Sequence, residues 1–340
     1  MSSGKRLKIA IYNRSSKPFS LQVYLENILN NIRCPNIEWE YVTSGKDVTS
    51  DIDMVWDPGL GMSRVPKVLQ VTKKPTVVTV HGLKAFSVPM SMWAESTKEK
   101  IHLLWKKYMI RYDWARFKKK VKAVLTPSYY GKREIVRGLR VSEKKVHVVP
   151  HGVDKSTFNK NIDESRQSDR HEYFLHVSSY QPVKNIRRMV EGYQKSEVDT
   201  QLKVIGPNFP EDCFNVDGVD WVTKECSHED LVSWYNGCKA FVFPSIRETF
   251  GMPVAEAMSC GAPIITSDGT GCKEVAKDAA ILVNPYSVES IAAAFKEVEE
   301  SSTIRNELAK KSMDRSKALR WSKSAKQHIS LFKQTANIRQ

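Results

Sequence analysis

The chain has 340 residues, of which 41% are hydrophobic and 27% are charged, as in ordinary globular proteins, and its length predicts two domains. No apolar run of about 18 residues occurs, which excludes a membrane-spanning helix. The short apolar run near the start indicates a first strand and not a signal peptide. Six scattered cysteines without a C-x-x-C pair argue against a zinc site or a disulfide framework and indicate a reducing cytosol.

The net charge of +15 is distributed unevenly along the chain. Residues 1–150 carry 28 Lys and Arg against 12 Asp and Glu, whereas residues 151–340 carry 25 against 26. A basic first half joined to a neutral second half predicts two tasks, one of which is contact with an anionic partner.

The first half alternates short apolar runs with helical stretches, which predicts a parallel sheet covered on both faces. Strands are expected at Leu7–Tyr12, Ile37–Val42, Met54–Trp56, Thr76–Val80, Ala123–Thr126 and Val146–Val149, and helices at 20–32, 62–70, 98–121 and 128–138. Turn residues follow at Pro150–Asp154, and the polar stretch 155–172 is expected to link two domains.

The second half repeats this alternation and predicts a second doubly wound domain. Strands are expected at Tyr173–Val177, Leu202–Ile205, Val219–Val222, Ala240–Pro244, Pro263–Thr266 and Ala280–Val283, and helices at 184–195, 228–237, 253–260, 271–276 and 287–300. We expect the two α/β domains to face each other across a cleft and ligands to bind at the carboxyl ends of the strands.

The stretch Pro244–Met258 carries two carboxylates eight residues apart, Glu248 on a loop and Glu256 one turn into the following helix. Gly251 permits close backbone approach, and Pro253 suits a first helical turn. Carboxylates can accept hydrogen bonds from the vicinal hydroxyls of a ribose or hexose, and the helix N-terminus offers N–H groups to a phosphate. Spacing alone leaves this site and an ordinary surface loop equally open.

Residues 244–263 resemble the E-x7-E signature of retaining glycosyltransferases of the GT-B fold, especially family 4. Other segments resemble motifs of the same family in the same order: P-N/H-G-V-D at 149–154, G-R-L-x-P-x-K-N/G at 178–185, V-x-G at 204–206, the glycine-rich turn at 267–275 and W-S/E-x-x-A at 321–325. The resemblance implies two Rossmann-like domains, residues 1–154 on the acceptor side and 173–318 for the donor, with the final helix, 319–340, packing back on the first domain.

The resemblance also implies roles for individual residues. Glu248 would contact the donor sugar, Glu256 would hold the ribose, and Lys184 would neutralise the diphosphate leaving group. His81 matches the histidine that reaches the donor across the cleft, with an ordinary loop histidine as the alternative. The remaining donor-binding positions implied are Ser179, Gly206, Ile246, Thr249, Phe250 and Gly251.

The chain departs from the family pattern at three places. Ser179 stands where the family usually has an arginine beside the diphosphate, so Arg14, Arg187 or Arg188 are candidate substitutes. Gly82 follows His81 where the family often has aspartate, and residues 13–20 replace the usual Gly-Gly loop.

Residues 98–122 hold ten Lys and Arg against two acidic residues. Apolar and aromatic residues recur there at helical spacing, namely Ile101, Leu104, Trp105, Tyr108, Tyr112 and Ala115, beside a basic stripe of Lys100, Lys107, Arg111 and Lys118. One interpretation is a core-packed helix with a solvated face. The other is contact with an anionic membrane or acceptor through Lys106, Lys107, Lys118, Lys119 and Trp105, with Trp114 and Phe117 among the aromatic residues.

The expected function is transfer of a hexose from a nucleotide diphosphate sugar, with retention and without a metal, to a lipid-linked, glycan or other anionic acceptor held by the basic domain. We expect no cofactor, and we assign the D-x-D of Asp51 and Asp53 to a strand flank. The expected location is cytoplasmic, with a peripheral membrane contact. The alternatives are a non-catalytic nucleotide-sugar binder, motivated by Ser179, and a glycosyltransferase acting on nucleic acid, for which no binding motif is visible.

Overall fold

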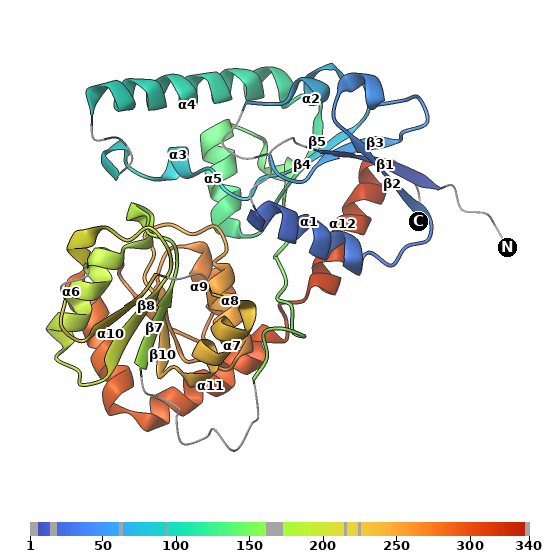
Figure 1. Ribbon diagram of the computed structural model, residues 1–340. Coiled ribbons are helices and arrows are strands. Elements are labelled where there is room, and N and C mark those ends of the chain that lie inside the picture. Colours follow the sequence, from blue (N-terminus) through green and yellow to red (C-terminus); the bar gives the residue numbers. More distant parts are fainter. Residues whose placement is uncertain are drawn as a thin grey trace. The chain divides into compact units, whose positions relative to one another are not determined.

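The computed structural model describes residues 6–13, 19–60, 64–92, 94, 96–160, 173–213, 216–223 and 226–336. The chain forms two compact units, one of Met1–Gly152 with Trp321–Gln340 and one of Val153–Arg320. Each unit contains a six-stranded sheet in which the paired strands are parallel, with helices beside it (Figure 1). The predicted fold class of two doubly wound α/β domains is thereby confirmed.

Unit 1 has the strand order β2-β1-β3-β4-β5-β6. Its strands are β1 (Leu7–Tyr12), β2 (Ile37–Val42), β3 (Met54–Asp57), β4 (Thr76–Thr79), β5 (Val121–Thr126) and β6 (Val146–Val148). Its helices are α1 (Phe19–Asn31), α2 (Lys67–Val71), α3 (Lys84–Ser87), α4 (Thr97–Phe117), α5 (Tyr129–Leu139) and α12 (Trp321–Thr335). The central strands β3 and β4 are buried along their whole length, as strands covered on both faces must be.

Unit 2 has the order β12-β11-β10-β7-β8-β9. Its strands are β7 (Tyr173–Val177), β8 (Gln201–Ile205), β9 (Val219–Val222), β10 (Ala240–Phe243), β11 (Ile264–Ser267) and β12 (Ile281–Val283). Its helices are α6 (Ile186–Ser196), α7 (His228–Gly237), α8 (Met252–Ser259), α9 (Gly271–Ala276), α10 (Val288–Glu300) and α11 (Ser302–Ser316). The first residues of the expected link pack here, because Phe158 is buried and its carbonyl accepts a hydrogen bond from Ser259.

Several helix limits differ from the sequence-based expectation for local reasons. The helix expected at 62–70 begins only after Pro66, since the residue before a proline is disfavoured in the helical region. The helix expected at 184–195 is interrupted at Asn185, which adopts a left-handed conformation between a 3-10 turn, Pro182–Lys184, and α6. The helix expected at 98–121 ends at Phe117 because β5 already begins at Val121. The four-residue helix α3 and the 15-residue helix α11 were not predicted.

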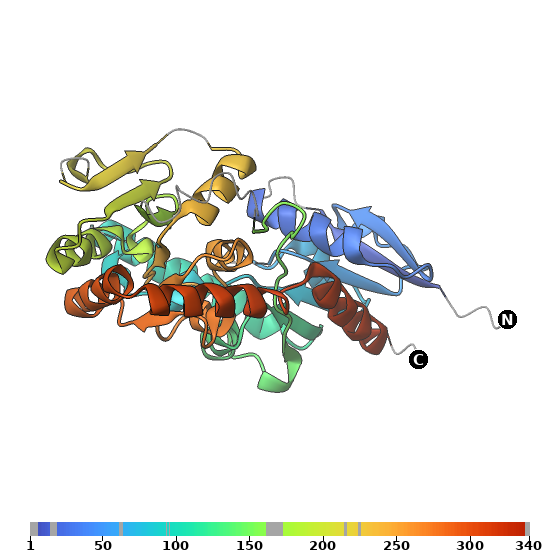
Figure 2. The same ribbon diagram turned by 90° about the horizontal axis from the view of Figure 1, so that it is seen from below.

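Helix α12 returns to unit 1, and both views place it with the N-terminal elements (Figures 1 and 2). Its His328 accepts a hydrogen bond from the Tyr24 hydroxyl of α1 at 2.7 Å, because its other ring nitrogen donates to the Ser324 carbonyl. Its Phe332 packs against Trp56 of β3, with ring centroids 5.1 Å apart. The chain's last described helix therefore completes the core of its first sheet.

Candidate active site in unit 2

The order of strands in unit 2 reverses between β7 and β10. From β7 the chain proceeds outward to β8 and β9, and from β10 it proceeds the opposite way to β11 and β12. In open parallel sheets, ligands bind beyond the carboxyl ends of the strands at such a reversal, because the loops on its two sides diverge there. The loops in question are 178–185 after β7 and 244–251 after β10.

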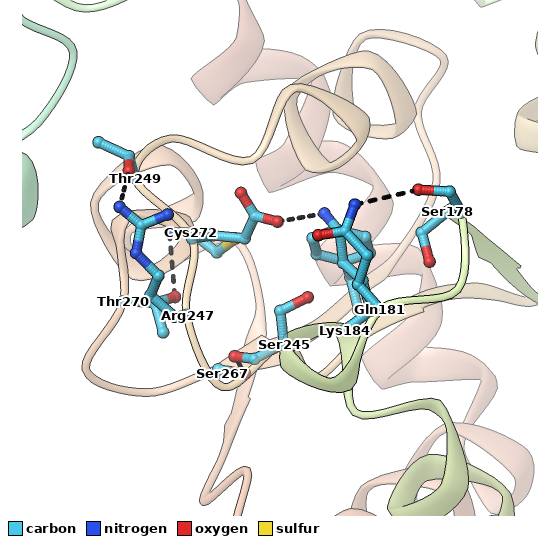
Figure 3. Close-up of polar contacts among 12 residues, drawn as sticks. Ser178, Gln181, Lys184, Ser245, Arg247, Thr249, Ser267, Thr270 and Cys272 are labelled. Carbon is cyan, nitrogen blue, oxygen red and sulfur yellow. Dashed lines mark hydrogen bonds and ion pairs between the residues drawn. The ribbon is translucent and has the colours of Figure 1, made fainter. Parts of the chain in front are cut away.

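These two loops bring Lys184 and Glu248 together. The Lys184 ammonium forms an ion pair with Glu248 Oε1, marked by the dashed line at Lys184 in Figure 3. The side chains are only 17% and 18% exposed, and the ammonium also lies over the Phe243 ring, 5.0 Å from its centroid. The backbone holds the loops in register, since Ile246 N–H donates to the Val183 carbonyl at 2.8 Å.

Two glycines allow the neighbouring backbone segments to approach. Gly206, at the end of β8, has a φ of 149°, and a Cβ there would overlap the Ser178 carbonyl. Gly251 caps α8 with a φ of 91°, and a Cβ there would press on Cys272 at the start of α9. A side chain at either position would separate the loops that carry the candidate site.

Glu256 lies on α8, where burial raises the pKa of its carboxyl to about 7 although a hydrogen bond from Tyr235 opposes the shift. The Tyr235 hydroxyl on α7 donates to Glu256 Oε2 at 3.5 Å. At neutral pH the carboxyl is therefore divided between its charged and neutral forms. A ligand hydroxyl that donates to this group would favour the charged form.

The arginines of α6 that are candidate substitutes for the cation missing at Ser179 bind neighbouring side chains. Arg187 donates to the Tyr180 hydroxyl at 3.1 Å, and Arg188 donates to Asn185 Oδ1 at 2.5 Å. Arg247 precedes Glu248 and donates to Thr249 Oγ1 at 2.9 Å, in the same view as Lys184 (Figure 3). Arg14 lies outside the described residues.

His81 belongs to unit 1, at the end of β4. Its Nε2 donates to the Pro58 carbonyl at 2.8 Å, so its Nδ1 is the lone-pair nitrogen facing His151 Nε2 at 3.4 Å. Burial lowers the pKa of the His81 imidazole, which is therefore neutral at pH 7. The Tyr24 ring packs edge-on against it, with centroids 4.5 Å apart. Its role toward the donor stays a prediction.

Helix α4 presents two apolar faces. The inner face, with Ile110, Trp114 and Phe117, is buried in the core of unit 1. The outer face carries the α4 ridge, which we define as Ile101, Leu104, Trp105, Tyr108 and Tyr112, between 44% and 64% exposed. The helix is core-packed with a solvated face, as one interpretation held, but these five and the exposed Ala115 are not the residues that enter the core. The grouping of Trp114 and Phe117 with a membrane surface is wrong, because both are buried.

The four lysines proposed for acceptor or membrane contact differ in exposure. Lys119 is exposed, whereas Lys106, Lys107 and Lys118 are half-buried. Burial, with the nearby Arg111 charge, lowers the pKa of Lys107, and Lys118 donates to the Arg140 carbonyl at 3.2 Å. These three lysines are therefore less exposed to a partner than Lys119.

The D-x-D of Asp51 and Asp53, just before β3, is contacted by one lysine. The Lys8 side chain contacts Asp51 Oδ2 at 2.6 Å, and the Lys8 backbone N–H donates to Asp53 Oδ2 at 2.9 Å. Among the described residues, no cluster of three or more His, Cys, Asp and Glu side chains could hold a metal ion. No described helix is long and apolar enough to cross a bilayer.

Sequence reasoning missed three supporting residues of the site. Tyr235 contacts Glu256 from another helix, and Phe243 lies beneath Lys184. His176 in β7 donates to the Val242 carbonyl and accepts from Ser178 Oγ at 2.7 Å, which fixes the start of the lysine-bearing loop. A polar residue inside the apolar run 173–177 was the available signal for His176, while the other two depend on strand order.

The two α/β units, each with a six-stranded parallel sheet, have the fold class of the GT-B glycosyltransferases. The sequence profile "Glycosyl transferases group 1" matches residues 157–315, and "Glycosyltransferase Family 4" matches residues 47–157. The chain belongs to this glycosyltransferase family, as the motif resemblance predicted.

Curated relatives include two bacterial mannosyltransferases. The chain is 25% identical to O-antigen chain mannosyltransferase B of Escherichia coli over 76% of its own length and 70% of the relative. It is 28% identical to O-antigen chain mannosyltransferase RfbU of Salmonella typhimurium over 66% of its length and 60% of the relative. Among solved structures, HepE of Anabaena with UDP and glucose aligns with a TM-score of 0.70 at 13% identity, covering 97% of this chain and all of the other. At this low identity, the similarity to HepE shows that the two chains share a fold.

Proposed function

We propose that the protein transfers a hexose, specifically mannose, from a nucleotide diphosphate sugar to a glycan or lipid-linked acceptor. The observation that carries this proposal is the ion pair of Lys184 with Glu248 beyond the carboxyl ends of β7 and β10, with Glu256 on the helix α8 that follows the Glu248 loop. The names of the two O-antigen mannosyltransferases support the choice of sugar and of acceptor class.

In this proposal each of the three residues binds a different part of the donor. Lys184 balances the charge that develops on the diphosphate as the glycosidic bond breaks, which lowers the barrier because the ammonium is already in place. Glu248 accepts hydrogen bonds from the sugar hydroxyls, and Glu256 accepts them from the ribose. The backbone of Thr249–Gly251, at the start of α8, lies beside Glu248 and serves the phosphate or sugar.

The stereochemical course is the second part of the proposal. The bond from the sugar to the leaving phosphate breaks, the electron pair leaves with the phosphate, and the acceptor oxygen bonds to the same face. The departing phosphate oxygen takes the acceptor proton, so no protein nucleophile is required. Nuclear magnetic resonance of the first-formed product would show an unchanged anomeric configuration.

The acceptor and the place of action form the third part. The excess of 16 positive charges in residues 1–150 suits an acceptor with a phosphate-linked lipid or another anionic group. We propose that the protein works at the cytoplasmic face of a membrane, to which unit 1 binds peripherally.

The function is tested by a thermal-shift screen with GDP-mannose, UDP-glucose and ADP-glucose, followed by transfer assays with the donor that stabilises the protein. The expected result is stabilisation by GDP-mannose and slow mannose transfer to an extracted lipid-linked glycan. Stabilisation without transfer or hydrolysis would favour the non-catalytic binder. No response to any nucleotide sugar would contradict the assignment.

Activity is expected to survive EDTA. Lys184 supplies the positive charge at the diphosphate, and the D-x-D carboxylates are already engaged by Lys8. The measurement is the transfer rate before and after treatment with excess EDTA. Complete loss of activity, restored by a divalent cation, would contradict the metal-independent proposal.

A further inference from the structure

The α4 ridge is a concentrated apolar surface on unit 1. Its residues follow the spacing i, i+3, i+4, i+7 and i+11, so they form one stripe along the outer side of the helix. The Tyr108 and Tyr112 rings stack with centroids 6.5 Å apart. Contiguous exposed apolar patches of this kind are uncommon on monomeric proteins and mark interaction surfaces.

Cations border the ridge on both sides. Lys100, Lys107, Arg111 and Lys118 follow one border at helical spacing, and Lys98 and Arg116, eighteen residues or five turns apart, lie on the other. Arg116 donates to the Tyr112 hydroxyl at 2.8 Å and lies over its ring, so charge and aromatic surface are contiguous.

The two acidic residues of α4 do not oppose this charge. Glu99 accepts from the Ser96 N–H in the capping box that starts the helix. Asp113 is buried on the inner side, where Arg64 binds it through two hydrogen bonds of 2.8 and 2.9 Å. The outward side of the helix is therefore apolar in the middle and positive at its edges.

We propose that α4 lies flat in the interface of an anionic bilayer, with Trp105, Tyr108 and Leu104 inserted among the lipid headgroups and acyl chains. Trp and Tyr suit this depth because one end of each ring is apolar and the other is polar. The exposed cations Lys98, Lys100 and Arg116 reach lipid phosphates, and each contributes about a fivefold gain in affinity. This inference names the contact surface of the membrane binding proposed above and rests on that proposal.

The test is sedimentation of the full chain with vesicles of phosphatidylglycerol and phosphatidylcholine, and with vesicles of phosphatidylcholine alone. We expect binding to the anionic vesicles, weakened at 1 M salt because the Debye length falls from about 10 Å at 0.1 M to about 3 Å. Lipids brominated along the acyl chain should quench Trp105 fluorescence, and Trp105→Phe should remove that quenching.

Two variants separate the apolar and charged contributions. Leu104→Ser/Trp105→Ser/Tyr108→Ser should abolish the salt-resistant part of binding, and Lys98→Glu/Lys100→Glu/Arg116→Glu should weaken binding at low salt by more than a hundredfold. The matched control is Tyr41→Ser, an exposed aromatic residue on β2 of the same unit. Thermal melting should show that all variants are folded, since the substituted side chains are exposed.

Several outcomes would overturn this inference. They are failure of the wild type to bind anionic vesicles at low salt, unchanged binding of the serine variant, and concentration-dependent self-association that the serine variant abolishes without lipid. Donor binding by unit 2 is measured separately with nucleotide sugars. Loss of membrane binding with intact donor binding therefore leaves the proposed chemistry standing.

A second inference follows independently from the ion pair in unit 2. Glu248 forms an ion pair with the Lys184 ammonium, the same group that would bind the diphosphate. A nucleotide sugar that takes Lys184 from Glu248 also offers the Glu248 carboxylate new partners, because the sugar hydroxyls donate hydrogen bonds to it. The nucleoside diphosphate product has lost the hydroxyls of the transferred sugar, so its negative charge lies close to the negative Glu248 carboxylate. We infer that Glu248 promotes release of the product by recapturing Lys184.

The test is calorimetric titration of wild type and Glu248→Gln with GDP, UDP and inorganic pyrophosphate. We expect the variant to bind the favoured nucleotide at least tenfold more tightly and to release it more slowly, while its turnover falls. The control is Glu289→Gln, an exposed glutamate that pairs with Lys195 on the same unit and should change nothing.

Equal or weaker binding of all three probes by Glu248→Gln would overturn the second inference. Tighter binding would support it even if the sugar specificity were wrong. Binding of nucleotides by the wild type without any transfer would count against the proposed enzyme only.

Discussion

Replacing Lys184 with methionine is expected to lower kcat/KM by about 10² to 10³-fold, because one preorganised charge at the leaving group is lost. The same change leaves Glu248 in a mostly buried place without its cation. An unpaired buried charge is destabilising, so Tm should fall as well. Steady-state transfer rates and thermal melting measure the two effects.

The double variant Lys184→Met/Glu248→Gln separates chemistry from stability. It should recover most of the lost Tm, since no unpaired charge remains, and it should stay inactive. Lys195→Met, which breaks an exposed ion pair with Glu289, is the matched control and should leave rate and Tm unchanged. Near-normal activity of Lys184→Met would remove this residue from the reaction.

Glu256→Gln is expected to weaken binding of the nucleotide and of the nucleotide sugar by about 10 to 100-fold, the usual cost of losing a hydrogen-bonded charge. Because burial raises the pKa of Glu256 to about 7, protons compete with the ligand for the wild-type carboxylate. Wild-type affinity should therefore be highest above pH 7 and fall by up to tenfold per pH unit below it. Titration calorimetry from pH 6 to 8 measures both effects.

The glutamine variant also has a stability signature. The pKa of Glu256 is higher in the folded chain than in the unfolded chain, so the charged form destabilises the fold as pH rises through about 7. Glu256→Gln should consequently raise Tm at pH 8 and change it little at pH 5. Donor binding that is equally tight in the variant and independent of pH would contradict the assignment to the ribose.

Most strands were predictable because they are short apolar runs buried in their sheets, although no residue of the edge strand β9 is buried. The ends of the helices were harder to predict, because they depend on single residues. Asn185 is an example, since its left-handed conformation interrupts a stretch whose apolar periodicity is otherwise continuous. Helix α11 has few apolar residues and only Leu308 among its large side chains is buried, so its periodicity is weak. Helix α4 shows the opposite difficulty, because periodicity cannot tell which of two apolar faces enters the core.

The site was predictable where motif spacing fixes it, at Lys184, Glu248 and Glu256. Its supporting contacts were not, because Tyr235 reaches Glu256 only through the packing of α7 and α8, and His176 reaches β10 only through the reversed strand order. The ion pair between Lys184 and Glu248 likewise depends on two loops 64 residues apart in the chain.

The return of α12 to the first sheet has a consequence for the order of folding during synthesis. The ribosome makes residues 153–320, which form unit 2, between the two segments of unit 1. At a synthesis rate of roughly 5–20 residues per second, the surface of unit 1 that α12 later covers stays uncovered for on the order of ten seconds or longer. Trp39 and Trp56, which pack against Phe332 of α12 in the folded chain, belong to that uncovered surface. Unit 2 can therefore mature first on the nascent chain, while unit 1 is exposed to aggregation and to ribosome-associated chaperones.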